Sequence, residues 1–170
     1  MMSIEKLEAK ILTVSDSIAA GSREDTSGAA LSDLLTTNSY VVMERRVVPD
    51  VIDEIANALS SMAYGFNGLI VTTGGAGFGQ RDFTPEATRR ILDRHAPGMG
   101  EAMRAVSPRG RLSRAMAGTR GASLILNVSA APGRAVEMLS AVLDVVPEAL
   151  ESLGGGSVPT VDAVELTSVD

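Results

Sequence analysis

The sequence predicts an α/β fold, a three-layer sandwich with a mostly parallel sheet and helices on both faces. Short β-rich runs alternate with segments of helical periodicity, and two of the runs are compact and apolar, as is typical of strands buried on both faces. The 170 residues, 45% of them hydrophobic, suit a single domain. We place it at residues 1–153 and expect residues 154–170, which begin with three glycines, to form a flexible tail.

The first half of the chain predicts two strand–helix pairs. Residues 10–16 form a β-rich run that ends in polar residues, and residues 40–50 form a second such run. Residues 27–37 and 51–63 carry apolar side chains at helical spacing and are predicted to be helices. Asp50 stands directly before the second of these helices, so capping its N-terminus is one role open to this carboxylate.

The second half adds the two apolar strands, residues 68–73 (GLIVTT) and 122–129 (ASLILNVS). Between them, Thr84 followed by proline predicts a helix start, with the threonine as N-cap and the proline at the first helical position. His95, the only histidine, falls in this predicted helix and is expected to be a surface or packing residue. Residues 133–146 are predicted to form a further helix.

Composition excludes several classes of function. The chain has no cysteine, which rules out disulfides, thiolate catalysis and cysteine zinc sites. Two Tyr, three Phe and no Trp argue against a base-stacking platform, and a net charge of -6 argues against general polyanion binding. No signal-peptide core or long apolar span is visible. We therefore expect a cytoplasmic protein that binds neither nucleic acid nor a membrane.

Arginine is concentrated in one part of this acidic chain. Nine arginines lie from Arg89 to Arg134, against only two acidic residues, Asp93 and Glu101. A basic segment of this kind would focus a small anionic ligand, and guanidinium groups suit bidentate contacts with phosphate or carboxylate. A solvated charged surface is the alternative interpretation.

A glycine-rich stretch, residues 71–92 (VTTGGAGFGQRDFTPEATRRIL), follows the third predicted strand, at the edge where such sheets bind ligands. It has neither the ending of a Walker A motif nor the spacing of a dinucleotide fingerprint. Its glycines would let backbone N–H groups approach an anion, or else serve only the geometry of a long turn. Asp82 in the same stretch would repel a phosphate unless Mg²⁺ bridged them, and Asp50 is the natural second carboxylate.

Five co-linear segments are similar to the motifs of one enzyme family. They are LTVSDS with EDTSG, RVVPDVIDEI, TTGGAGFGQRDFTPEAT, APGMGEAMR, and LSR followed by AG, RG and LILN. Together they resemble the molybdopterin adenylyltransferase family, which includes the G domain of gephyrin, and the resemblance covers about residues 10–153. It implies that molybdopterin and Mg-ATP are converted to adenylylated molybdopterin and pyrophosphate, the step before molybdate insertion.

The resemblance also implies roles for individual residues. Asp50 and Asp82 match the catalytic carboxylates that hold Mg²⁺. The positions that match substrate-binding residues are Ser15, Asp16, Asp25, Thr73, Gly74, Gly75, Gly77, Glu101, Ser113 and Arg114. The ligands implied are small anions, ATP and molybdopterin. A homotrimer and a separate molybdenum-insertion protein are further implications.

Two departures from the family pattern stand near these positions. Ala76 replaces the usual threonine of TGGTG, and Ser129-Ala130 replaces the Pro-Gly of the LNLPG segment. Arg134, shortly after the second departure, could offer an anion contact. The departures leave two alternatives open: a catalytically weak relative that binds molybdopterin or nucleotide, and a trimeric scaffold that passes molybdopterin to a partner.

Overall fold

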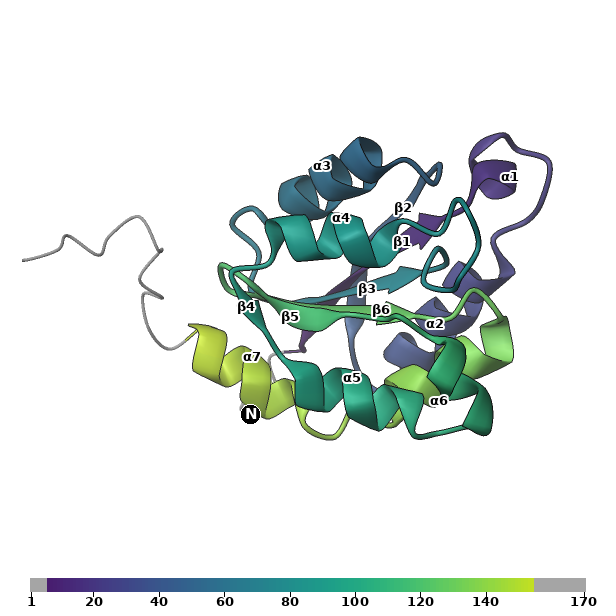
Figure 1. The fold of residues 1–170 in the computed structure, drawn as a ribbon. Helices are drawn as coiled ribbons and strands as arrows, with labels where there is room; N and C mark the ends of the chain where they lie inside the picture. The colour runs from purple at the N-terminus through teal and green to yellow at the C-terminus, as the bar shows by residue number, and fades with distance from the viewer. Residues whose placement is uncertain (1–5, 155–170) are drawn as a thin grey trace, which may run out of the picture.

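The computed structural model describes residues 6–154, and Figure 1 shows one sheet between two helical layers. The strands, in their order across the sheet, are β2 (Val41–Val48), β1 (Glu8–Val14), β3 (Leu69–Thr73), β6 (Ser123–Val128), β5 (Ala117–Arg120) and β4 (Arg94–His95). The first four strands run parallel, whereas β5 and β4 are antiparallel to their neighbours. The predicted fold class is confirmed.

Helices cover both faces of the sheet (Figure 1). One face carries α3 (Ile52–Ala63) and α4 (Thr84–Ile91), and the other carries α2 (Thr26–Thr37), α5 (Pro97–Arg104), α6 (Pro132–Ser140) and α7 (Val146–Gly154). The short helix α1 (Asp16–Ala19) follows β1, and a 3₁₀ helix, η1 (Pro108–Leu112), follows α5. In the described part of the chain, none of the helices combines the length and apolar character needed to cross a bilayer.

Strand alternation divides the core into two layers. Ile11 packs with Leu31 and Leu35 of α2, whereas the next residue, Leu12, packs with Ile55 and Leu59 of α3. Successive side chains of a strand point to opposite faces, so a strand between two helical layers must be apolar on both. All positions of β3 and β6 are buried, as their compact apolar sequences predict.

Two of the predicted helices are wrong in extent. The segment after Thr84 ends as a helix at Ile91, and the Asp93 N–H then donates to the Thr119 carbonyl at 2.8 Å, so His95 lies in strand β4 and not in a helix. The helix predicted at residues 133–146 stops at Ser140, and α7 starts afresh at Val146. A proline at position 147 lacks the N–H that a continuous helix would need.

Two of the predicted N-caps are also wrong. Thr84 is the first residue of α4, and its hydroxyl donates to the Gly74 carbonyl at 2.9 Å instead of capping the helix. Val51, not Asp50, occupies the N-cap position of α3, and it makes no side-chain cap bond. Both polar side chains are therefore engaged with the glycine-rich loop. The predicted tail, apart from Gly154 at the end of α7, lies outside the described residues.

Candidate active site

The loops that leave the carboxyl ends of β1, β2, β3 and β6 are tied to one another. The Ser15 N–H donates to the Val48 carbonyl at 3.0 Å, which joins the ends of β1 and β2. The Thr73 hydroxyl donates to the Ser129 carbonyl at 2.8 Å, which joins the loops after β3 and β6. In the order β2-β1-β3, the connection from β1 to β2 runs in one direction across the sheet, and the connection from β2 to β3 runs in the opposite direction. Both connections start at this edge of the sheet, where open α/β sheets bind ligands.

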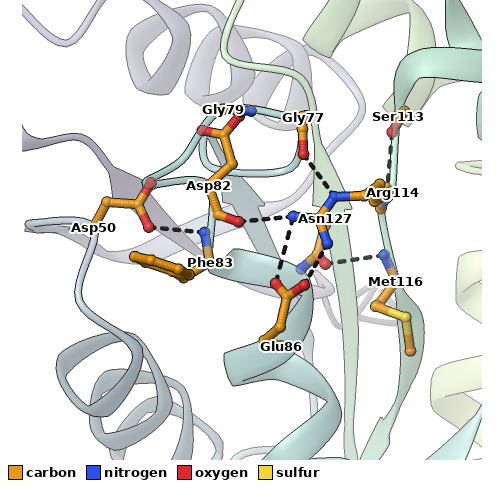
Figure 2. Close-up of polar contacts among 11 residues, drawn as sticks. Asp50, Gly77, Gly79, Asp82, Phe83, Glu86, Ser113, Arg114, Met116 and Asn127 are labelled. Atoms are coloured by element: carbon orange, nitrogen blue, oxygen red, sulfur yellow. Dashed lines mark hydrogen bonds and ion pairs between the residues drawn. The ribbon is translucent and has the colours of Figure 1, made fainter.

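A buried hydrogen-bond network around the Asn127 side-chain amide supports this edge of the sheet. Asn127 of β6 is fully buried, and its Nδ2 donates to the Thr72 hydroxyl at 2.8 Å and to the Thr88 hydroxyl at 3.1 Å. Its Oδ1 accepts the Met116 N–H at 3.0 Å (Figure 2). One side chain thus links β3, β6, α4 and the approach to β5, and its polar atoms are satisfied as burial requires.

The first two glycines of the loop have a backbone conformation that favours glycine, and the second also makes room for Asp50. Gly74 and Gly75 have φ angles of 99° and 68°, in the left-handed region that side chains disfavour. A Cβ on Gly75 would lie 2.8 Å from Asp50 Oδ2, and closer still to the Thr84 hydroxyl. Glycine is required here by backbone geometry and by the close approach of a carboxylate.

The next two glycines surround Asp82 in the same way. A Cβ on Gly77 or on Gly79 would lie 2.9 Å from Asp82 Oδ2, and the Gly79 N–H donates to that oxygen at 2.8 Å (Figure 2). Phe78, between these glycines, leaves 67% of its surface exposed. Gly77, Gly79 and the Asp82 carboxylate are therefore one structural unit, the Gly77–Asp82 hairpin (residues 77–82).

Asp50 is a buried carboxylate with a perturbed pKa. It is 7% exposed, and its Oδ1 accepts the Phe83 N–H at 3.0 Å. Burial raises the pKa of Asp50 from 3.8 to about 6; the Phe83 N–H opposes the shift, while the charges of Asp82 and Asp16 add to it. The charges of Asp82 and Asp16 thus act on Asp50, and a cation close to Asp50 would offset their effect.

Arg81 holds Asp16 and the end of β2 together. Its Nε donates to Asp16 Oδ2 at 2.6 Å, and its Nη2 donates to Asp16 Oδ1 at 3.0 Å and to the Asp50 carbonyl at 3.2 Å. The Asp50 N–H also donates to Asp16, at 3.0 Å. The Arg81 hydrogen bonds, aided by that N–H, hold the pKa of Asp16 below its usual value. Sequence reasoning missed Arg81, although it adjoins Asp82.

Two predicted substrate-binding residues serve as helix caps. Asp25 accepts the Gly28 N–H at 2.9 Å at the start of α2 and also accepts the Thr13 hydroxyl at 2.8 Å. Ser15 accepts the Ile18 N–H at 3.3 Å at the start of α1. Both residues lie in the loop after β1, as predicted, but their polar atoms stabilise that loop.

A cavity of about 220 Å³ opens beside the hairpin. One side is the glycine loop with Gly75, Gly77 and Asp82, all of which were predicted. Ser113, also predicted, lines it as well. Glu101 does not: it lines a neighbouring depression with Arg104 and Arg111.

Arg109 and Arg134 line the same cavity. Within residues 6–154, neither guanidinium group has a hydrogen-bond or ion-pair acceptor, so both are available to a ligand anion. The signal for them in the sequence is the concentration of arginine from residue 89 to residue 134. Arg134 was already a candidate anion contact because it follows the Ser129-Ala130 departure, whereas nothing in that segment distinguished Arg109 before the cavity was known.

The two loops that depart from the family pattern, at Ala76 and at Ser129-Ala130, are both held by hydrogen bonds within the protein. Ala76 is almost buried, and its carbonyl accepts the Arg114 N–H at 2.8 Å. In the other loop, the Ser129 hydroxyl accepts the Ala131 N–H at 3.2 Å, while the Ser129 carbonyl accepts the Thr73 hydroxyl. A serine turn therefore closes the loop where a Pro-Gly sequence was expected.

Comparisons with known proteins agree on one group of relatives. Residues 10–152 match the family described as "Probable molybdopterin binding domain". The chain is 37% identical over 152 residues to molybdopterin adenylyltransferase of Helicobacter pylori J99, covering 85% of this chain and 86% of that protein. It is 35% identical over 141 residues to molybdopterin adenylyltransferase of Escherichia coli K12, covering 79% and 72%. The solved structure of the molybdopterin biosynthesis enzyme MoaB from Thermus thermophilus matches with a TM-score of 0.83 and 43% identity, covering 88% of this chain and 98% of that one.

Proposed function

The chain belongs to the molybdopterin-binding domain family, and from this premise we propose that it acts in molybdenum cofactor biosynthesis as a molybdopterin adenylyltransferase. The observation that carries the proposal is that Asp82, Arg109 and Arg134 line one cavity, with the Asp50 carboxylate next to Gly75 of its lining. The names of the relatives in Helicobacter pylori and Escherichia coli support the same activity.

The proposed reaction brings two anions together. An oxygen of the terminal phosphate of molybdopterin forms a bond to the α-phosphorus of ATP, the bond between the α- and β-phosphates breaks, and pyrophosphate leaves. No protein nucleophile is needed, so the chain contributes positioning and charge neutralisation. Arg109 and Arg134, which have no acceptor among the described residues, are suited to hold phosphate oxygens.

We assign Mg²⁺ to the acidic side of the cavity. Among residues 6–154 no group of three or more acidic or histidine side chains is arranged to hold a metal ion, which fits an ion held by one or two carboxylates together with substrate phosphates. Asp50 and Asp82 would hold it, and their mutual repulsion favours a cation between them. When bound, the ion neutralises phosphate charge and polarises the phosphoryl group.

Ser113 and the predicted residues of the glycine-rich loop divide into two groups within this scheme. Gly75, Gly77 and Ser113 would contact the substrates directly, since they line the cavity. Thr73 and Gly74 act by shaping the loop, because the Thr73 hydroxyl and the Gly74 carbonyl are both hydrogen-bonded within the protein.

A single-turnover experiment tests the function. Molybdopterin and Mg-ATP are mixed with excess protein, and adenylylated molybdopterin and pyrophosphate are measured for the natural chain and for Asp82→Asn. We expect turnover in the natural chain and a loss of roughly 100- to 1,000-fold in Asp82→Asn. Asp53→Asn, which changes an exposed carboxylate paired with Arg90, is the matched control and should turn over normally.

Two other outcomes would contradict the proposal. Molybdopterin binding without pyrophosphate release in the natural chain would make it a binding relative or a scaffold. No molybdopterin binding would mean that the Ser129-Ala130 loop serves a different substrate.

We further propose that the chain is a cytoplasmic homotrimer whose product passes to a separate molybdenum-insertion protein. Sedimentation equilibrium should then give three times the 17.6 kDa mass of one chain. A monomeric mass at micromolar concentration would contradict the trimer without affecting the proposed reaction.

A further inference from the structure

The Arg114 side chain donates hydrogen bonds to both ends of the Gly77–Asp82 hairpin. Its Nε donates to the Gly77 carbonyl at 2.6 Å, and its Nη2 donates to the Asp82 carbonyl at 2.7 Å. Its Nη1 donates to the Glu86 carboxylate, and Nη2 lies 3.5 Å from the second oxygen of that carboxylate (Figure 2). All three guanidinium nitrogens thus have acceptors within the protein.

These contacts form a bracket, in which Arg114 joins the two ends of the hairpin that carries Asp82, the carboxylate needed by the proposed reaction. Gly77 and Asp82 are the first and last residues of the hairpin, and Arg114 joins their carbonyls through one rigid, planar group. Inside the bracket, the Asp82 carboxylate accepts the Gly79 N–H, and the Asp82 N–H donates to the Gly79 carbonyl at 3.1 Å. The direction of the Asp82 side chain therefore depends on the closure of the hairpin.

Glu86 connects the bracket to the core. It lies in the first turn of α4, where Ala87 and Ile91 are buried against α3 and the sheet. The hydrogen bond from Arg114 lowers the pKa of Glu86, which keeps this carboxylate ionised. The pair thus fixes the hairpin to a packed helix.

The hairpin needs such an external fixture because Gly77 and Gly79 have little intrinsic conformational preference, so the backbone does not hold the loop by itself.

We propose that Arg114 and Glu86 are positioning residues, which clamp the Gly77–Asp82 hairpin so that the Asp82 carboxylate faces the cavity and which do not contact the substrate. The role assigned to Arg114 by family resemblance, substrate binding, is thereby replaced. The kinetic part of this inference rests on the proposed function, whereas its structural part does not.

Amide exchange of Gly79 tests the clamp without any substrate. We would measure it by NMR in Arg114→Ala, Arg114→Lys and Glu86→Gln, with Arg90→Ala as the control. Arg90 lies on the same helix and pairs with Asp53 at 2.6 Å, away from the hairpin. Exchange should accelerate by about tenfold or more in Arg114→Ala. Arg114→Lys should not restore protection, because one ammonium group cannot make the separate hydrogen bonds of the planar guanidinium group. The control should match the natural chain.

Kinetics separate positioning from substrate contact. Arg114→Ala should lower kcat by roughly 10- to 100-fold and leave the KM for ATP within about twofold, as expected when a catalytic group is misplaced. The double variant Glu86→Gln/Arg114→Ala should be no slower than Arg114→Ala alone, because the two residues act as one unit. Where Arg114→Ala fails to fold, Glu86→Gln carries both measurements.

Two results would overturn the inference. One is unchanged Gly79 exchange in folded Arg114→Ala and Glu86→Gln. The other is a raised KM for ATP at constant kcat in Arg114→Ala, with Glu86→Gln fully active, which would make Arg114 a substrate contact. If the natural chain forms no adenylylated molybdopterin, the proposed function fails, and Gly79 exchange still decides the clamp.

Discussion

The cavity has two sides that are built in opposite ways. The acidic side consists of Asp82, which lines the cavity, with Asp50 next to Gly75 and Asp16 next to Asp50. It is held by contacts within the protein: each carboxylate accepts a backbone N–H, and Asp16 also accepts Arg81. The basic side (Arg109 and Arg134) has no acceptor for either guanidinium group among residues 6–154. One side is therefore complete before a ligand arrives, and the other is completed by the ligand.

Electrostatics explains this difference. Carboxylates whose charges act on one another must each be held in place by the protein. At Asp50, burial raises the pKa, and the charges of Asp82 and Asp16 add to the shift. An arginine that binds phosphate oxygens binds them more tightly when it has no acceptor within the protein, because an internal acceptor would have to be displaced when the ligand binds.

The largest effect should come from Gly75→Ala, which disrupts the acidic side. Gly75 has a φ of 68°, and its new Cβ would lie 2.8 Å from Asp50 Oδ2. We expect a fall in the free energy of unfolding of about 2–4 kcal/mol, measured by urea denaturation, and loss of turnover. Gly98→Ala is the control, since nothing lies within 4 Å of its Cβ position and its φ is not positive. Equal stability of the two variants would contradict the crowding at Asp50.

A smaller effect, confined to ligand binding, should follow Arg109→Ala or Arg134→Ala. Each should weaken ATP or molybdopterin binding by about tenfold in calorimetry, which corresponds to one charge-assisted contact. The free energy of unfolding should stay within about 0.5 kcal/mol of that of the natural chain, because no internal contact is lost. Arg94→Ala, on β4 and away from the cavity, should leave binding unchanged. A large loss of stability would show that the basic side is also held internally.

The smallest effect should be a pH dependence that Asp50 introduces. Because its folded-state pKa of about 6 exceeds its ordinary value of 3.8, the folded protein binds more protons than the unfolded chain between these values. The free energy of unfolding should therefore fall as pH rises from about 4 to 6, and Asp50→Asn should be more stable than the natural chain at pH 7.5 by about 1 kcal/mol. Parallel stability–pH curves for the two proteins would contradict this.

The same titration should govern Mg²⁺ binding. Below about pH 6 the Asp50 carboxylate is protonated in the free protein, so protons compete with the ion there. Calorimetry of Mg²⁺ with a non-hydrolysable ATP analogue should show affinity falling as pH drops through this value. An affinity independent of pH from about 5 to 7.5 would remove Asp50 from the proposed ion site.

Sequence reasoning found the architecture, and the fold class and family are confirmed. The roles of Asp50 and Asp82 stay predictions. Sequence reasoning succeeded where local pattern and burial agree, as in β3 and β6, which are apolar because helices cover both faces. It failed at helix boundaries such as the end of α4, where a hydrogen bond from Asp93 to Thr119 in a distant strand decides the conformation.

Residue roles within the site were harder to predict than residue positions. Helix caps and ligand contacts use the same side chains, so the sequence could not tell that Asp25 caps α2. Arg81 and Arg114 act through carbonyl groups far away in the sequence, and carbonyl groups leave no mark in an amino-acid pattern. Their roles became visible only from the hydrogen-bond geometry.

Phe78 is a suitable site for a fluorescent probe in the hairpin. The chain contains no tryptophan, and Phe78 lies between two glycines with 67% of its surface exposed. Phe78→Trp would therefore introduce a single tryptophan, in a position with room for the larger indole ring. Its emission would report solvent access and quenching at one loop alone, so stopped-flow fluorescence could follow nucleotide arrival in real time without a chemical label.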